Sequence, residues 1–174
     1  MAVYTKINKK DISYINKKFE IEKIINFKGI KQGIENTNYL LRSKNKKFIL
    51  TIFEKRVSQN EIPFFMKLMD QLNNSKINCP KPQKNKNGNY LVRIRKKSAC
   101  IVSFLEGKDK KLLNLKNCHE IGKIIAGMHL STKKINLSRK NSMGIRYLNP
   151  LLKSIKFKSK KFTNIEKFLK INFK

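Results

Sequence analysis

The predicted fold rests on the stretch from Phe27 to Arg56, which reads FKGIKQGIENTNYLLRSKNKKFILTIFEKR. Two apolar runs, NYLL and FILTIF, flank the polar segment SKNKK, and this pattern predicts a β-hairpin with strands at Asn38–Arg42 and Phe48–Phe53. A segment rich in glycine and asparagine, GIENTN, precedes the first strand. Both residue types tolerate tight turns, so a loop is expected to lead into the hairpin.

Amphipathic periodicity predicts a helix on either side of this hairpin. Asp11 is expected to cap a short helix that carries Ile12, Ile15 and Phe19 on one face. After the hairpin, apolar residues recur at helical spacing through the run IPFFMKLMDQL, which starts at Ile62.

The start of the second helix has two interpretations. Ser58 and Glu61 have the spacing of a capping box. Pro63 suits only the first turn of a helix, which instead favours Asn60 as the cap.

Further strands are expected downstream of this helix. Asn87-Gly88 is a two-residue hairpin signal, and Tyr90–Ile94 follows it as a strand. A turn at KKS then leads into ACIVSFLEG, a nearly continuous apolar run that is typical of a buried strand and ends at Gly107.

Beyond residue 107 the pattern is helical only. Asn114 or Asn117 opens a helix, and its apolar face consists of Cys118, Ile121, Ile124, Ile125 and Met128. A sparser helical pattern reaches Lys174, and its apolar stripe consists of Ile165, Phe168 and Leu169. The order of elements predicts an α+β fold: a small antiparallel sheet with one helix packed on it, then a helical part.

Composition limits the class of protein and leaves one alternative open. The net charge is +30, from 41 Lys and Arg against 11 Asp and Glu, so counterion release could support nucleic-acid binding. The competing interpretation is a compositional bias, because lysines occur in every predicted element. No apolar run approaches the roughly 20 residues of a membrane span. Cys79, Cys100 and Cys118 form no CxxC pair, which favours reduced thiols and a cytoplasmic location.

Several stretches together resemble the bacterial homoserine kinases of the aminoglycoside phosphotransferase-like superfamily. The resemblance runs from Met1 to about Leu152 and lies in MAVYT, FKGIKQGIENTNYLL, KFILTIFEKRV, IPFFMKLMDQL, CPKP, NGNYLV, ACIVSFLEG and IGKIIAGMHLS. It implies ATP-dependent phosphorylation of the hydroxyl of L-homoserine, a step of threonine biosynthesis. It also implies a kinase-like nucleotide-binding lobe over residues 1–106, a hinge at 103–107, and the start of a helical lobe over 107–174.

The resemblance assigns roles to particular residues. Gly33, Asn36 and Asn38 would belong to the loop that covers the phosphates. The hinge would hydrogen-bond adenine through the backbone of Ser103, Phe104, Leu105 and Glu106. Without the resemblance, the hinge segment would be interpreted as a buried strand that ends at a glycine.

Two departures from the kinase pattern affect the site. The position of the usual third-strand lysine falls on Thr51, so Lys55 and Arg56 become the candidate phosphate-binding cations. Glu61 either orients such a cation or caps the following helix.

The second departure concerns catalysis. The family's His-Gly-Asp loop and later magnesium-binding Asp have no counterpart, since only Glu120 and Glu166 are acidic after Asp109. We therefore expect no catalytic residue and no ligand for the family's Mg²⁺ in this chain, and no activity of the chain alone. It would be a fragment, a degraded gene product, or half of a split enzyme with a complementing C-terminal half. The alternative is a non-catalytic basic module that binds nucleic acid or another polyanion. If the charge is merely spread over the surface, polyanion binding is expected to be non-specific, falling steeply with salt and ignoring base sequence.

Overall fold

The computed structural model describes residues 3–54, 58–107, 110–133, 135–140, 144 and 150. The chain divides into two units, residues 1–137 and 138–174, and the elements below belong to the first. The expected tail helix with Ile165, Phe168 and Leu169 lies outside the described residues.

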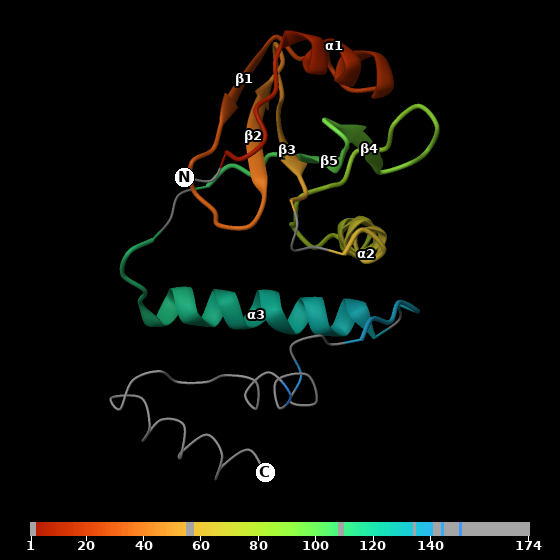
Figure 1. The fold of residues 1–174 in the computed structure, drawn as a ribbon. Coiled ribbons are helices and arrows are strands. Elements are labelled where there is room, and N and C mark those ends of the chain that lie inside the picture. Colours follow the sequence, from red (N-terminus) through yellow and green to blue (C-terminus); the bar gives the residue numbers. More distant parts are fainter. Residues whose placement is uncertain are drawn as a thin grey trace, which may run out of the picture. The chain divides into compact units, whose positions relative to one another are not determined.

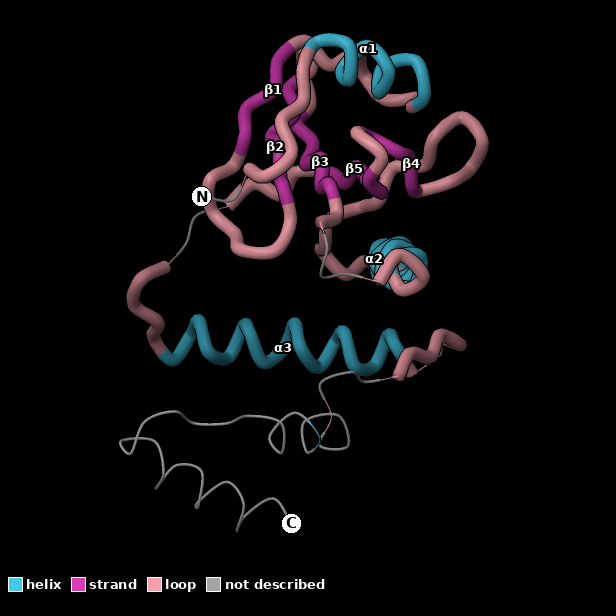
Figure 2. Tube along the Cα trace, in the orientation of Figure 1, coloured by secondary structure: helices cyan, strands magenta, loops and turns pink. Residues whose placement is uncertain are grey.

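The first unit is built on one antiparallel sheet (Figures 1 and 2). Its strands are β1 (Asn26–Gly29), β2 (Thr37–Arg42), β3 (Lys47–Ile52), β4 (Leu91–Ile94) and β5 (Lys97–Ser103). Their order across the sheet is β1-β2-β3-β5-β4. The predicted α+β class is confirmed. The small antiparallel sheet that the sequence predicts has five strands among the described residues.

The predicted hairpin forms between β2 and β3. Leu41 lies opposite Phe48, and Asn38 lies opposite Thr51. Ser43 closes the connecting turn, because its N–H donates to the carbonyl of Lys46 over 2.9 Å. Alternation of apolar side chains therefore predicted both strands to within a residue.

Helix α1 (Lys9–Lys18) covers one face of the sheet. Ile15 of the helix and its C-cap residue Phe19 are fully buried there. The predicted cap was wrong by three residues: Asn8 is the N-cap, and its side chain accepts hydrogen bonds from the backbone N–H groups of Lys10 and Asp11. Asp11 completes a capping box by accepting from the N–H of Asn8 over 2.8 Å.

Helix α2 (Ile62–Asn74) packs on the opposite face (Figure 1). Ile62 and Met66 are buried there against Cys100 of β5. Neither Ser58 nor Asn60 caps this helix; Glu61 is the N-cap residue and makes no side-chain capping bond. A helical backbone at Glu61 (φ −90°, ψ −22°) explains the difference, because a capping side chain needs an extended residue at that position.

The connection between β4 and β5 also differs from the expectation. The two strands are joined by Arg95 and Lys96, both with positive φ (50° and 65°), as in the mirror-image turns that suit hairpins. Asn87-Gly88 instead forms a turn within the loop before β4, where Gly88 has φ +78° and its N–H donates to the carbonyl of Asn85.

Helix α3 (Leu115–Thr132) follows the hinge segment. Of the two predicted caps, Asn114 is the one used, and Asn117 completes its capping box. The helix approaches the end of α2 at Gly127, where an added Cβ would lie 3.6 Å from the side chain of Ile77. Among the described residues, no helix combines the length and apolarity that crossing a membrane requires.

Candidate functional site

The loop between β1 and β2 is built around Gly33. This residue has φ +111°, a conformation that side-chain-bearing residues rarely adopt. The base of the loop is closed by Ile30, whose N–H donates to the carbonyl of Asn38 over 2.9 Å. Residues 31–35 between these ends are exposed, so the backbone of the loop is open to a ligand.

Asn38 and Thr51 form a polar pair at the foot of this loop. The two residues are opposite each other on β2 and β3, and the Thr51 hydroxyl donates to Oδ1 of Asn38 over 2.8 Å. Because Oδ1 of Asn38 already accepts this hydrogen bond, the side-chain donor Nδ2 is the group left to contact a ligand. That nitrogen lies beside the loop, 3.8 Å from where a Cβ on Gly33 would be. The pair therefore presents a neutral N–H donor next to an open, glycine-centred backbone, an arrangement suited to an anion.

Asn36 has a different environment from Asn38. Its Oδ1 accepts a hydrogen bond from the backbone N–H of Glu54 over 3.3 Å. The contact links the loop to the chain just after β3. Asn36 therefore connects the loop to the sheet, while Asn38 and Gly33 lie together.

The predicted hinge segment, residues 103–107, leaves the sheet at Ser103. Its N–H donates to the carbonyl of Lys81 over 2.9 Å, and its hydroxyl accepts from the N–H of Lys81 over 2.8 Å. Phe104 donates its N–H to the carbonyl of Lys47 over 3.2 Å. The backbone donors of these two residues are thus already used, by the linker at Lys81 and by β3 at Lys47. The more exposed Leu105 and Glu106 are the part of the predicted hinge that is open to a ligand.

Lys47 covers the start of this segment. Its ammonium lies 5.3 Å from the ring centroid of Phe104 and 2.6 Å from Oε1 of Glu106. The ion pair is exposed at both ends, so it contributes little to stability, at most about 1 kcal/mol.

Three apolar side chains complete the site and were missed as site residues in the sequence. Leu40 lies opposite Ile49, and Ile49 lies opposite Val102, so the three form a row across β2, β3 and β5. All three are half-buried, whereas the apolar residues next to them along the strands point into the core on the α1 face: Tyr39, Leu41, Phe48, Leu50 and Ile101. The row ends next to the predicted hinge segment, where Val102 also packs against the cluster of Ile62, Met66 and Cys100. The period of two along each strand could have separated these residues from the core.

The remaining predicted residues are not brought into this arrangement. Lys55 and Arg56 lie outside the described residues. Glu61 stands at the start of α2, and its predicted role in orienting a cation stays a prediction. Within the described ranges, no group of His, Cys, Asp and Glu side chains is close enough to hold a metal ion.

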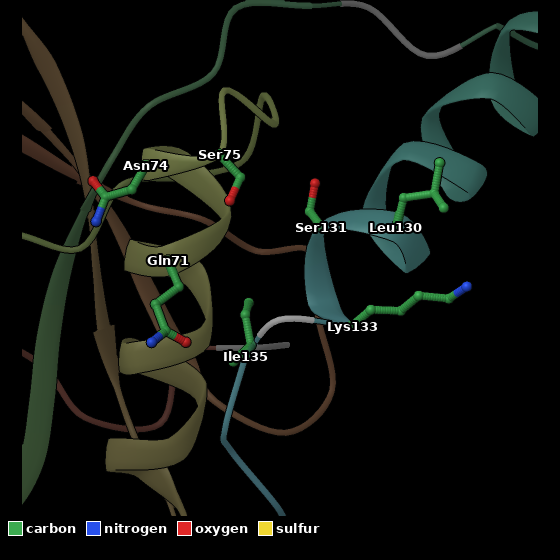
Figure 3. Close-up of a pocket in the computed structure, with 7 residues that line it drawn as sticks. All are labelled: Gln71, Asn74, Ser75, Leu130, Ser131, Lys133 and Ile135. Carbon is green, nitrogen blue, oxygen red and sulfur yellow. The ribbon is translucent and has the colours of Figure 1, made fainter.

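A hollow between α2 and the end of α3 is separate from the loop and the hinge. Its lining consists of Gln71, Asn74, Ser75, Leu130, Ser131, Lys133 and Ile135. Figure 3 shows that the Lys133 side chain extends away from Gln71. The polar groups therefore do not converge on one point, and the sheet face remains the candidate site.

The comparisons with known proteins agree with this geometry. Residues 26–152 match the phosphotransferase enzyme family, and the chain belongs to that family. A homoserine kinase of Parvibaculum lavamentivorans is 36% identical over 154 residues, which are 88% of this chain and 48% of that protein. A homoserine kinase of Paramagnetospirillum magneticum is 37% identical over 156 residues, which are 90% of this chain and 48% of that protein. The chain thus spans about half the length of the curated relatives it matches.

Solved structures show the same fold at low sequence identity. A spectinomycin phosphotransferase in complex with ADP and spectinomycin has a TM-score of 0.63 at 14% identity, over 97% of this chain and 54% of that one. A microcompartment-associated aminopropanol kinase has a TM-score of 0.62 at 14% identity, over 82% of this chain and 47% of that one. The predicted kinase-like fold is confirmed by these matches.

Proposed function

We propose that this chain supplies the nucleotide-binding lobe of an ATP-dependent kinase that phosphorylates the hydroxyl of L-homoserine, a step of threonine biosynthesis. The observation that carries the proposal is the placement of Gly33, Asn38 and Thr51 together at the open end of β2 and β3. The names of the relatives support the acceptor, and the ADP complex of the spectinomycin phosphotransferase supports the use of a nucleotide.

The two ends of a nucleotide fit two parts of the sheet face. The row of Leu40, Ile49 and Val102 offers apolar contact to adenine, and the hinge beside it offers backbone groups. The loop around Gly33 offers open backbone and the Nδ2 donor of Asn38 to the phosphates. Lys55 and Arg56 remain the proposed source of positive charge, because Thr51 is neutral.

Mg²⁺ would neutralise phosphate charge in a transfer of this kind. The described residues bring together no set of carboxylates that fits it, so no step through the ion follows from this chain.

The exposed apolar face of α3 supports the proposal that the enzyme includes a second polypeptide segment. Ile121, Ile124, Ile125 and Met128 are 36–57% exposed, although the sequence pattern marks them as an apolar face. Since the curated relatives are about twice as long as this chain, we propose that this face packs against a polypeptide that corresponds to their second half.

The cysteines bear on the location of the protein, and the distribution of lysines bears on the alternative function. Three free cysteines fit a reducing compartment, so a cytoplasmic location is proposed with the function. A basic nucleic-acid-binding module is not favoured, because lysines are spread over α1, α2, α3, β1, β3 and β5. Polyanion binding that falls steeply with salt and ignores base sequence is what such a spread predicts.

The proposal is tested by titrating the chain with ATP and with adenosine while amide chemical shifts are recorded. Salt near physiological strength is needed, because a net charge of +30 attracts any polyphosphate in dilute buffer. Adenosine should change the amide chemical shifts near Leu105. ATP should change those shifts and also the amide chemical shifts near Gly33. Asn38→Ala should weaken ATP binding, and the matched control Asn26→Ala, at an exposed position of β1, should not. Equal weakening by both variants, or shifts spread evenly over the surface, would contradict the assignment.

A further inference from the structure

A partly buried polar cluster lies on the other face of the sheet, behind the loop. We name it the Glu54 cluster; its members are Thr5, Thr37, Glu54 and Lys97. Oε1 of Glu54 accepts hydrogen bonds from the hydroxyls of Thr5 and Thr37, each over 2.7 Å. Oε2 of Glu54 pairs with the ammonium of Lys97, which also donates to the Thr5 hydroxyl over 2.8 Å. One carboxylate thus joins three segments that are far apart in the sequence.

Thr37 links Glu54 to the segment of the chain that precedes α1. It is fully buried, and its hydroxyl accepts the backbone N–H groups of Tyr4 (3.0 Å) and Thr5 (3.1 Å) while it donates to Glu54. A hydroxyl has one proton, so the carboxylate fixes its direction and leaves its lone pairs for the two amides. The segment before α1 is thereby fixed against the end of the loop.

The same residues hold the loop at two more points. The Tyr4 hydroxyl donates to the carbonyl of Ile34 over 2.9 Å. The N–H of Glu54 donates to Oδ1 of Asn36 over 3.3 Å. The loop is therefore held at Ile34, Asn36 and Thr37, on the side away from the open sheet face.

Ionised Glu54 is well suited to this arrangement. Its side chain is only 10% exposed. Burial by itself raises the pKa of Glu54, but hydrogen bonds from Lys97, Thr5 and Thr37 and the charge of Lys97 outweigh burial and lower the pKa below its ordinary value. A carboxylate only accepts hydrogen bonds, and all three neighbours of its oxygens donate.

We propose that Glu54 is a positioning residue that holds the loop around Gly33 in the conformation that covers nucleotide phosphates, an inference that rests on the proposed function. The exposed, glycine-centred loop has many conformations open to it without these bonds. Apparent affinity falls in proportion to the fraction of molecules in the competent conformation. Loss of the cluster therefore weakens contacts to phosphates and leaves contacts to adenosine unchanged.

The test compares dissociation constants for ATP and adenosine in the full 174-residue chain by chemical-shift titration. Glu54→Gln retains the size of the side chain but turns an N–H group toward the Lys97 ammonium or the threonine hydroxyls. We expect about a tenfold rise in the dissociation constant for ATP and no change for adenosine. Glu54→Gln leaves the Lys97 ammonium without its carboxylate partner. The double variant Glu54→Gln with Lys97→Met also removes that ammonium and should recover part of the ATP affinity. The control Arg95→Met removes a surface ion pair with Asp11 and should leave both constants unchanged.

Two further measurements make the result decisive. Tyr4→Phe removes only the bond to Ile34 from a side chain that is 57% exposed, so it keeps the fold even where Glu54→Gln does not. It should weaken ATP binding alone, by severalfold. Hydrogen exchange without nucleotide should quicken at amides 33–37 in both variants, relative to β4 and β5.

The outcomes separate this inference from the proposed function. A folded Glu54→Gln chain that binds ATP as the unchanged chain does, or that loses ATP and adenosine equally, overturns the positioning role. If Glu54→Gln does not fold, unchanged ATP affinity in Tyr4→Phe overturns it. If the unchanged chain binds no ATP, the proposed function fails, and exchange at the loop amides decides whether the cluster holds the loop.

Discussion

The hydroxyl of Thr51 donates a hydrogen bond of 2.8 Å to the carboxamide oxygen of Asn38 across the β2–β3 pair. Thr51 occupies the third strand of the sheet, where many kinases have a lysine that binds phosphates. A neutral hydroxyl cannot replace that charge. It orients a neighbouring amide instead, so that Nδ2 of Asn38 lies beside Gly33.

Thr51→Val is predicted to weaken ATP binding severalfold without weakening adenosine binding. Valine keeps the shape of threonine but lacks the hydroxyl, so the Asn38 carboxamide is free to turn. The lost hydrogen bond should lower the free energy of unfolding by about 1 kcal/mol. Titration and urea unfolding measure the two effects. Equal loss of ATP and adenosine affinity would show that Thr51 supports the whole site rather than the amide.

The loop and the hairpin could be predicted from the sequence because both depend on residues that are close together in the chain. Alternating apolar residues mark β2 and β3, and one of the two predicted caps, Asn114, opens α3. The turn at Arg95-Lys96 carries no such signal, because positive φ at two basic residues is imposed by the paired strands rather than by residue preference.

The parts of the candidate site that were missed depend on tertiary contacts. Glu54 and Lys97 are 43 residues apart, and nothing local marks them as partners. Leu40 and Ile49 are apolar strand residues like their neighbours; the period of two sorts them onto the opposite face, but the packing of α1 decides which face is the core. Lys55, Arg56 and the boundary between lobes at 103–107 stay predictions.

The stability of the chain is predicted to depend on pH through Glu54. Its pKa is lower in the folded chain than its ordinary value of 4.5, so the unfolded chain binds the proton first as pH falls. The stabilisation from Glu54 is therefore complete above pH 4.5 and is lost as pH falls through the lowered pKa.

Urea unfolding of the unchanged chain and of Glu54→Gln at a series of pH values isolates this contribution from other acids. The difference in unfolding free energy should be constant near neutral pH and should shrink in acid. A difference that grows as pH falls would mean that Glu54 is protonated in the folded chain.

The 174-residue chain by itself is predicted to have no homoserine kinase activity. Phosphoryl transfer needs a carboxylate to orient the attacking hydroxyl, and the sequence after Asp109 contains only Glu120 and Glu166. Assays with ATP and L-homoserine test this against a preparation from cells that carry the empty vector. Turnover above that control would contradict the prediction and would mean that an acid elsewhere in the chain orients the hydroxyl.

The exposed face of α3 is predicted to contribute little to the stability of the chain alone. Ile124 is 57% exposed, so Ile124→Asp removes few contacts and should change the free energy of unfolding by no more than about 0.5 kcal/mol. Ile101 is fully buried in the sheet, and Ile101→Ala should cost about 2–5 kcal/mol by leaving a cavity. Urea unfolding of both variants gives the comparison.

Ile124→Asp also tests whether the apolar face of α3 binds a second polypeptide. When the chain is mixed with the second half of the Parvibaculum lavamentivorans homoserine kinase, Ile124→Asp should weaken association, because a carboxylate would be buried against apolar side chains. A matched change on the polar side of α3, Lys123→Asp, places the same charge at a position that is already solvated and should leave association unchanged. If Ile124→Asp destabilises the lone chain as much as Ile101→Ala does, the face is already packed within this chain, and a partner is not needed to cover it.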